Sequence, residues 1–426
     1  MRSAILASCL ILPQMPVTLH ADDRSDSATA RALVKQLENS DKKKRNEVIE
    51  QLSRLGNTAI PVLIEGLGNE DERVSDGCMS ALHDMGARTL PALSRALTAN
   101  ESSVRQLAAI AMVGMQGDMK PAVVPLISAL GHKDAKTRRS AIMALTFIGD
   151  TRALVPLSYA LLDEDEAVQF EAVVAFENFG SDGRIALPTL ILMLRDIPKK
   201  ELPYDLGVNI KGALAQIGGP AVPSILYEMR RKDTPLELIQ LFIGAFHEMV
   251  QVKDAKELRP ALPYFIEILK GSREREVKDG LISVLQRMEE SARDAIPILQ
   301  KLMRGKEAST RVEAANALCW INIRSRKTYV QPIIAGLSDP SAAVRYRAAF
   351  FISQLGGDAA EAIPALLKTL KDEDVDVRLV SCHALGAMRG KAAVAIPALT
   401  VVAEKDMDET VRKAARDAIG MIPRKP

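Results

Sequence analysis

Residues 341–371 read SAAVRYRAAFFISQLGGDAAEAIPALLKTLK. Four apolar residues in the first half of this stretch fall at helical spacing: Val344, Ala348, Ile352 and Leu355. This spacing predicts a helix with one apolar face. Gly356 ends that helix, because glycine readily adopts the left-handed conformation that a helix C-terminus favours. Pro364 opens a second helix, where its missing N–H costs no hydrogen bond.

The same helix pair recurs along the whole chain. A proline at the start of an apolar run returns every thirty to forty residues, at Pro61, Pro91, Pro125, Pro156, Pro188, Pro223, Pro263, Pro297, Pro332, Pro364 and Pro397. A fixed period of this length indicates stacked repeats. We count eleven complete pairs, with lone helices at 27–39 and 408–421 that cap the open apolar faces. The sequence therefore predicts an all-α fold, a solenoid of about eleven helix pairs with half-repeat caps.

The composition argues against several classes of function but does not identify one. The chain has 426 residues and a net charge of +2, so no strong overall field points to nucleic acid or an anionic membrane. Aromatic residues make up only 4%, too few for a platform on which bases stack. The four cysteines, Cys9, Cys78, Cys319 and Cys382, lack metal-ligand spacing, and three of them lie in apolar helical segments. We expect those three to be buried and unreactive.

Residues 1–21 are predicted to be a bacterial secretory signal peptide. Arg2 precedes an apolar stretch at 4–12, and a cleavage site is expected after Ala21. Residues 22–426 would then form the solenoid, exported to the periplasm. The alternative is a leader on a cytoplasmic protein. No run of about twenty apolar residues predicts a membrane-spanning helix.

A basic residue marks one position of many first helices: Arg45, Arg105, Arg138, Arg311, Arg345, Arg378 and Arg412, with Lys278 in the same place. One interpretation is a basic stripe that binds anions. The other is a ladder in which each arginine bonds the aspartate of the neighbouring repeat or the carbonyls of a turn. We favour the ladder, because a residue that recurs once in every repeat is expected to stabilise the contact between repeats.

The pattern Val-Arg-x-x-Ala-x-x-Ala-Leu-Gly followed by Ala-Ile-Pro-Ala-Leu resembles that of HEAT repeats, above all the subgroup named after the phycobilisome lyases. The resemblance covers residues 27–423, with its best copies at 344–370, 377–399 and 411–420. It implies a right-handed α-solenoid with first helices on the convex side and second helices lining the concave side. It also implies an interaction scaffold, since a minority of the family are enzymes or pigment-attachment factors.

The repeat pattern weakens at residues 196–260. Two prolines, Pro198 and Pro203, interrupt the helical rhythm, and a long turn is predicted at 252–259. One interpretation is drift in a tolerant repeat. The other is that this segment holds a hinge or a binding determinant, because departures from a repeat often carry binding.

Catalytic and nucleic-acid motifs are weak. His247-Glu248 and His83-Asp84 lie on different helices, and most metal sites need at least three converging ligands. No phosphate-binding glycine loop or nucleophile motif occurs. The basic runs 42–45, 138–139, 230–232 and 324–327 alternate with acidic ones, and Trp320 is the sole tryptophan. We therefore expect no enzyme, cofactor or metal, and we disfavour nucleic acid.

The sequence thus predicts a non-enzymatic scaffold that binds a protein or peptide on its concave helical surface. Five residues of second helices are candidates for partner contact: Tyr159, Arg195, Glu228, Arg231 and Lys270. The alternatives are an enzyme, either similar to the bilin lyases or a metal-dependent HEAT-repeat enzyme, and a solenoid that binds nucleic acid.

Overall fold

The computed structural model describes residues 21–38, 40–196, 204–271 and 274–423. These residues form helices joined by short turns, and no strand occurs among them. The chain divides into two compact units, Met1–Ala175 and Phe176–Pro426. The predicted signal peptide lies almost wholly outside the described residues.

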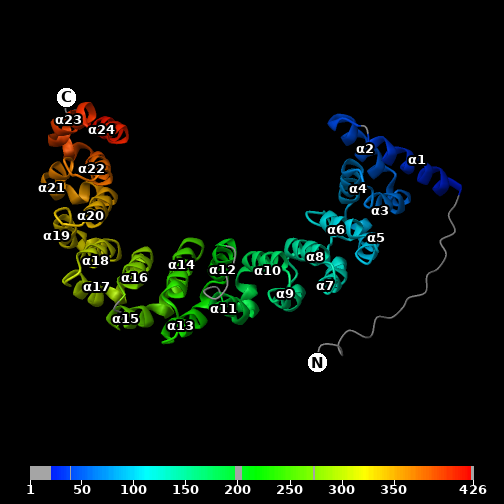
Figure 1. Cartoon of the computed structure of the whole chain (residues 1–426), viewed down its shortest axis with the longest axis horizontal. Helices are drawn as coiled ribbons and strands as arrows, with labels where there is room; N and C mark the ends of the chain where they lie inside the picture. Colours follow the sequence, from blue (N-terminus) through cyan, green and yellow to red (C-terminus); the bar gives the residue numbers. More distant parts are fainter. Residues whose placement is uncertain (1–20, 39, 197–203, 272–273, 424–426) are drawn as a thin grey trace. The chain divides into compact units, whose positions relative to one another are not determined.

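The first unit begins with the lone helix α1 and continues as helix pairs (Figure 1). Its helices are α1(Ala21–Leu37), α2(Lys42–Arg54), α3(Ile60–Gly66), α4(Glu72–Asp84), α5(Leu90–Ala96), α6(Ser102–Ala111), α7(Val123–Ala129), α8(Ala135–Ile148) and α9(Leu154–Ala160), with 3-10 turns η1(Gly56–Thr58), η2(Gly86–Thr89), η3(Lys120–Ala122) and η4(Thr151–Ala153). Helix α10(Glu166–Phe179) contains the boundary between the units.

The second unit continues the same alternation up to the lone helix α24. Its helices are α11(Leu187–Asp196), α12(Tyr204–Ile217), α13(Val222–Arg230), α14(Leu236–Val252), α15(Leu262–Gly271), α16(Arg275–Arg287), α17(Ile296–Met303), α18(Ala308–Ile321), α19(Arg326–Gly336), α20(Ala342–Leu355), α21(Ile363–Thr369), α22(Val375–Ala387), α23(Ile396–Lys405) and α24(Glu409–Met421). The 3-10 turns are η5(Gly180–Ala186), η7(Gly219–Ala221), η8(Ala255–Ala261), η9(Glu289–Ala295), η10(Ile323–Ser325), η11(Gly356–Ala362) and η12(Arg389–Ala395).

The predicted repeat is confirmed. Eleven helix pairs, from α2–α3 to α22–α23, lie between α1 and α24 in the described part of the chain. Gly149 ends α8 with φ 66°, and Gly356 follows α20 with φ 51°, so both adopt the positive φ that their predicted role requires. One proline differs from the pattern: Pro332 lies inside α19, which begins at Arg326.

Most of the described part of the segment predicted to be irregular is helical, with the longest non-helical stretches at residues 231–235 and 253–254. Most of the predicted turn at 252–259 belongs to the 3-10 helix η8. Helix α14 buries Phe242 and Phe246, and the ring of Phe246 meets that of Phe265 edge-on at 5.0 Å. Large rings thus fill this part of the core.

The two helices of each pair lie on different sides of the stack, and the sides are the reverse of those expected. Within each unit, successive even-numbered helices pack closely, whereas successive odd-numbered helices touch little. A stack curves toward its more closely packed side, as α12 to α24 show in Figure 1. We therefore call the even-numbered helices α2 to α24 inner helices and the odd-numbered helices α3 to α23 outer helices.

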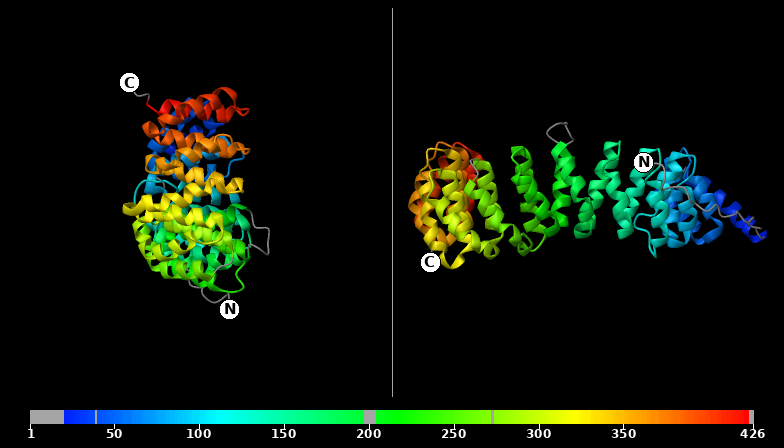
Figure 2. Two further views of the ribbon diagram at one scale, coloured as in Figure 1. Left: turned by 90° about the vertical axis from the view of Figure 1, so that its left-hand side faces the viewer. Right: turned by 90° about the horizontal axis from the view of Figure 1, so that it is seen from below.

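The expectation that the proline-initiated second helices line the concave side is therefore wrong. The Val-Arg helices carry small buried residues at their contacts, including Ala348, Ala384 and Ala415, so their backbones approach closely. The proline-initiated helices are shorter and spread apart. Figure 2 shows the pairs stacked side by side within each unit.

Candidate functional site

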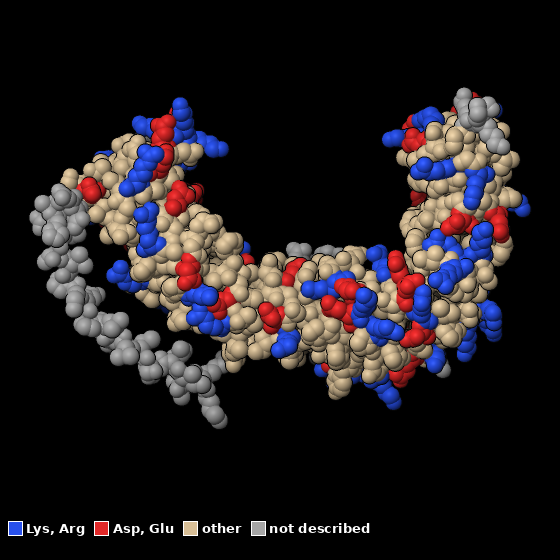
Figure 3. Space-filling model, turned by 180° about the vertical axis from the view of Figure 1, so that it is seen from behind, with Lys and Arg blue, Asp and Glu red and all other residues tan. Residues whose placement is uncertain are grey.

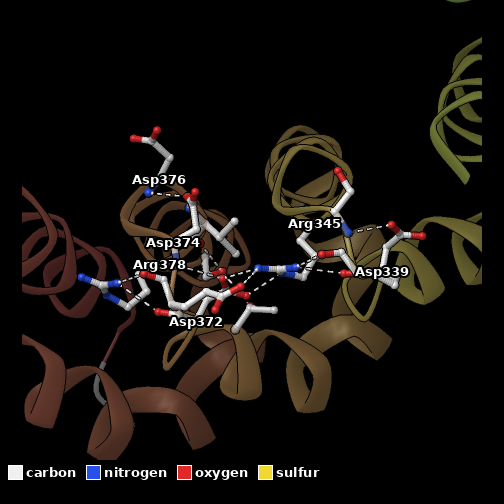
Figure 4. A network of polar contacts seen from close by, with 12 residues as sticks. Asp339, Arg345, Asp372, Asp374, Asp376 and Arg378 are labelled. Atoms are coloured by element: carbon white, nitrogen blue, oxygen red, sulfur yellow. Dashed lines mark hydrogen bonds and ion pairs between the residues drawn. The ribbon is translucent and has the colours of Figure 1, made fainter. Parts of the chain in front are cut away.

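The arginines predicted to form a ladder do so at four junctions between repeats. The guanidinium groups of Arg105, Arg138, Arg345 and Arg378 pair with Asp134, Asp163, Asp372 and Asp406, respectively, each on the following repeat. Figure 4 shows Arg345 directed at Asp372, and Arg378 close by, whose Nη1 donates to the carbonyl of Asp372 at 3.0 Å. The ladder interpretation is confirmed for these residues.

Each pair is saturated with hydrogen bonds. Arg345 donates Nε and Nη2 to Asp372 at 2.7 Å each, and Nη1 to the carbonyls of Asp339 and Pro340 at 3.0 and 2.9 Å. Burial acts to raise the pKa of Asp372, but the hydrogen bonds from Arg345 and from the backbone N–H of Asp374, together with the charges of Arg345 and Arg378, hold the pKa below its usual range. A buried carboxylate and a buried guanidinium therefore compensate each other and fasten α20 to α22.

One junction lacks this pair although both residues are present. Arg311 on α18 and Asp339 stand at the positions that Arg345 and Asp372 hold one repeat later. Arg311 instead donates only to the carbonyls of Gly305 and Lys306, at 3.2 and 2.5 Å, while Asp339 accepts from the backbone N–H of Ser341 at 3.0 Å. Of the neighbouring inner helices from α12 to α24, α18 and α20 also make the least contact.

A cleft lies along this weak junction, on the inner side of the second unit. Its volume is about 540 Å³, and α14, α16, α18 and α20 all contribute to it. The lining residues are His247, Arg275, Glu276, Asp279, Gly280, Ser283, Gln286, Glu313, Tyr346, Arg347, Phe350 and Phe351. We refer to this feature as the inner cleft.

Aromatic side chains form one wall of the inner cleft. Tyr346 and Phe350 are one turn apart on α20, with nearly parallel rings (5°) whose centroids lie 6.3 Å apart. Both rings are about 40% exposed, 41% for Tyr346 and 40% for Phe350. Gly280 and Ser283 of α16 also line the cleft, and neither has a large side chain. The result is a recess with one apolar, planar wall.

Buried carboxylates belong to the same cleft. Glu313 of α18 forms an ion pair with Arg347. Burial raises the pKa of Glu313 to about 7; Arg347 opposes this shift, and the negative charge of Asp279 adds to it. Asp279 itself accepts hydrogen bonds from Ser309 and Thr310 at 2.9 and 3.0 Å. The ion pair with Arg347 therefore does not offset the burial of the Glu313 carboxylate and the nearby negative charge of Asp279.

Two polar atoms near the cleft have no hydrogen-bond partner among the described residues. One is Nε2 of His247, whose pKa is lowered to about 4 by burial and by the charges of Arg287 and Lys211. The other is Oδ1 of Asn316, a fully buried residue whose Nδ2 donates to Gln286 at 3.0 Å. Buried polar atoms without partners are uncommon and mark places where a ligand can bind.

The five residues predicted to contact a partner lie on outer helices or at their ends, and none of them lines the inner cleft. Tyr159 is 73% exposed on α9, and Lys270 is exposed at the end of α15. Glu228 is buried, at 7% exposure, with Arg195 and Arg231 each 3.7 Å from its Oε2. The structure brings these last three together into one charged cluster, which leaves Glu228 little surface to offer a partner.

An apolar groove borders that cluster. Pro188, Leu192, Pro223 and Tyr227 line it together with Arg195 and Glu228. Tyr227, which sequence analysis passed over, is far more exposed than its neighbour Glu228. Tyr227 and Glu228 are adjacent on α13, so their side chains point in different directions. Tyr227 faces solvent, whereas Glu228 is buried.

The other sequence predictions have mixed outcomes. Cys78, Cys319 and Cys382 are buried, and burial raises the pKa of each thiol to about 12.

His247 does not join His83 in any metal site: the part of the chain that the structure describes holds no group of three or more His, Cys, Asp or Glu residues placed to bind a metal ion. Within the same ranges, no helix is both long and apolar enough to cross a membrane.

Charged side chains of both signs are interspersed on the surface. Figure 3 shows Lys and Arg alternating with Asp and Glu on the face it presents, without a continuous basic stripe there. Many of these charges are paired locally, as in Arg152 with Asp150 and Arg231 with Asp233. Such pairs offer little net positive potential to a phosphate backbone.

Sequence comparison agrees with this architecture. The family model for HEAT repeats matches residues 30–113, 123–202 and 330–420, more than half of the chain. The chain belongs to the HEAT repeat family. The finer resemblance to the phycobilisome-lyase subgroup stays a prediction. Among curated proteins, no sequence matches this HEAT repeat chain.

Solved structures of Kap121p are similar in fold. The protein alone gives a TM-score of 0.57 at 17% identity, its complex with Ste12p 0.61 at 15%, and the karyopherin bound to the SUMO protease Ulp1p 0.59 at 16%. Each match covers 94% of this chain and 49% of Kap121p. The HEAT repeat chain thus spans about half the length of these structures, and at this identity the likeness shows the fold alone.

Proposed function

We propose that this HEAT repeat chain is a non-enzymatic scaffold that binds a protein or peptide partner, and that the inner cleft is the centre of the contact. The single observation that carries the proposal is the exposed aromatic wall, Tyr346 and Phe350, on the inner side where α18 and α20 make little contact. Aromatic residues in a recess are typical anchors of protein interfaces.

The structural neighbours support the same class of function. Kap121p has been crystallised with several proteins, among them Ste12p and Ulp1p. Its fold therefore serves protein binding in at least one other chain, and we extend that role to this one. We also propose export to the periplasm, which fractionation of cells that produce the full chain would test.

A pull-down with residues 22–426 as bait tests the proposal. We expect one protein to be recovered near stoichiometrically, and to be lost when Tyr346→Ala and Phe350→Ala are combined. The matched control is Tyr159→Ala, which removes an exposed ring from an outer helix and should leave recovery unchanged.

Two outcomes would count against the proposal. Loss of the partner with Tyr159→Ala alone would move the contact to the outer helices, where sequence analysis first placed it. Recovery of nucleic acid, pigment or metal without a protein would favour the alternative functions.

A further inference from the structure

We propose that the inner cleft recognises an arginine side chain of the partner, held between the buried carboxylate of Glu313 and the ring pair Tyr346–Phe350. This inference rests on the proposed function and names the chemistry of the contact. It follows from the distribution of charge, hydrogen-bond acceptors and aromatic surface within the cleft.

The acidic and basic side chains of the cleft lie at different depths. The carboxylates of Glu313 and Asp279 are deep, with side chains 5% and 11% exposed, whereas the guanidinium groups of Arg347 and Arg275 lie at the rim, 47% and 56% exposed. Exposed charges are screened by water and salt, and buried ones are not. The acidic groups therefore lie inside the cleft, and the cations lie at its edge.

Unused hydrogen-bonding capacity inside the cleft also favours a ligand that donates. Glu313 accepts from Arg347 through Oε1, and its Oε2 has no hydrogen-bond donor among the described residues. Oδ1 of Asn316, which is buried beside the cleft rather than lining it, also lacks a donor among the described residues. An anion would bring further acceptors and face two carboxylates, so it is disfavoured.

The aromatic wall distinguishes arginine from lysine. A guanidinium is planar, stacks on an aromatic face and presents five donors in a fixed fork, whereas an ammonium is compact and strongly hydrated. The parallel rings of Tyr346 and Phe350 offer a flat surface beside Glu313. A guanidinium stacked on this wall would direct its donors toward the carboxylate.

Fluorine NMR of the full chain labelled with fluorotyrosine tests this directly, because the chain has only six tyrosines and the Tyr346→Phe variant assigns the relevant signal. The probe is N-acetyl-arginine amide, with the lysine and citrulline analogues as controls. Citrulline keeps the shape of arginine but lacks its charge. We expect the Tyr346 signal to shift with the arginine probe, at a dissociation constant in roughly the millimolar range for a single side chain.

Three comparisons decide the outcome. Lysine should bind about fivefold more weakly and citrulline at least about tenfold more weakly, and Glu313→Gln should weaken arginine binding by about tenfold. Glu237→Gln is the matched control, since it removes an exposed carboxylate of α14 that does not line the cleft and should change little. Equal binding of arginine and citrulline, or unchanged binding in Glu313→Gln, would overturn the inference.

The pull-down tests the scaffold function and the NMR titration tests the arginine inference, so either can give a negative result without the other. A captured protein that depends on Tyr346 and Phe350, together with no arginine response, would leave the scaffold function standing and remove the arginine inference. An arginine response without any protein partner would instead indicate a free cationic ligand, and would contradict both the proposed function and a partner arginine.

Discussion

Two neighbouring junctions of the second unit use the same residue types and differ in structure. Between α20 and α22, Arg345 and Asp372 form a buried, fully bonded pair; between α18 and α20, Arg311 and Asp339 remain apart. We call the first the closed junction and the second the open junction. The difference teaches that a repeated motif supplies the parts of a contact, while helix packing decides whether the contact forms.

The largest expected effect separates the two junctions directly. Asp372→Ala leaves the buried guanidinium of Arg345 without its carboxylate, which should lower the free energy of unfolding by about 3–5 kcal/mol. Asp339→Ala, its counterpart at the open junction, should cost less than about 1 kcal/mol. Urea denaturation followed by circular dichroism measures both. Equal losses would show that the open junction closes in solution.

The fold was predictable because its signals are local and repeated. The period of the prolines, the glycines after first helices and the half repeats at both ends all follow from the sequence, and so did the role of Arg345 and Arg378. Curvature was not predictable, because it depends on which helices pack more tightly, and the side assigned to the second helices was wrong.

The inner cleft was not predictable for a related reason. Arg311 and Asp339 fit the repeat as well as Arg345 and Asp372 do, so nothing in the sequence marks their separation. The only available signal was an unusual pairing of residues on inner helices: Glu313, in a stretch otherwise rich in alanine, and Tyr346 with Phe350 one turn apart. His247 was noticed, but for a metal site that the described residues do not form.

The second largest expected effect is a dependence of stability on pH that arises from Glu313 at the open junction. The pKa of Glu313 is raised to about 7 in the folded chain from its usual 4.5, so the folded state holds this proton more tightly than the unfolded state. Stability should therefore fall as pH rises from about 4.5 to 7, by roughly 3 kcal/mol for a shift of this size. Glu313→Gln should remove that fall.

Thermal melting of both proteins across this pH range measures the effect, and the difference between them cancels the other titrating groups. His247 acts in the opposite sense, because its lowered pKa costs stability as pH drops below about 6.5. A difference between wild type and Glu313→Gln that does not vary with pH would show that Glu313 is not buried at the open junction.

The smallest expected effect tests how far stability spreads from each junction. Arg389 follows α22 with φ 52°, a conformation that glycine adopts without strain, as Gly356 does after α20. Arg389→Gly should stabilise its repeat by about 1 kcal/mol. Hydrogen exchange should slow in α20 and α22, which the closed junction couples, and stay unchanged in α18.

Glu289→Gly is the counterpart on the other side, since Glu289 follows α16 with φ 47°. It should slow exchange in α16 and α18 and leave α20 unaffected. Protection that crosses from α18 to α20 in either variant would contradict a weak junction between them.

The missing pair between α18 and α20 also has a mechanical consequence. Because each repeat touches only its neighbours, the repeats of a stack behave under tension like springs in series. The softest spring then takes most of the extension. A pulling force on the second unit would lengthen it first at the inner cleft, so a partner anchored there would stiffen the unit at its most compliant point.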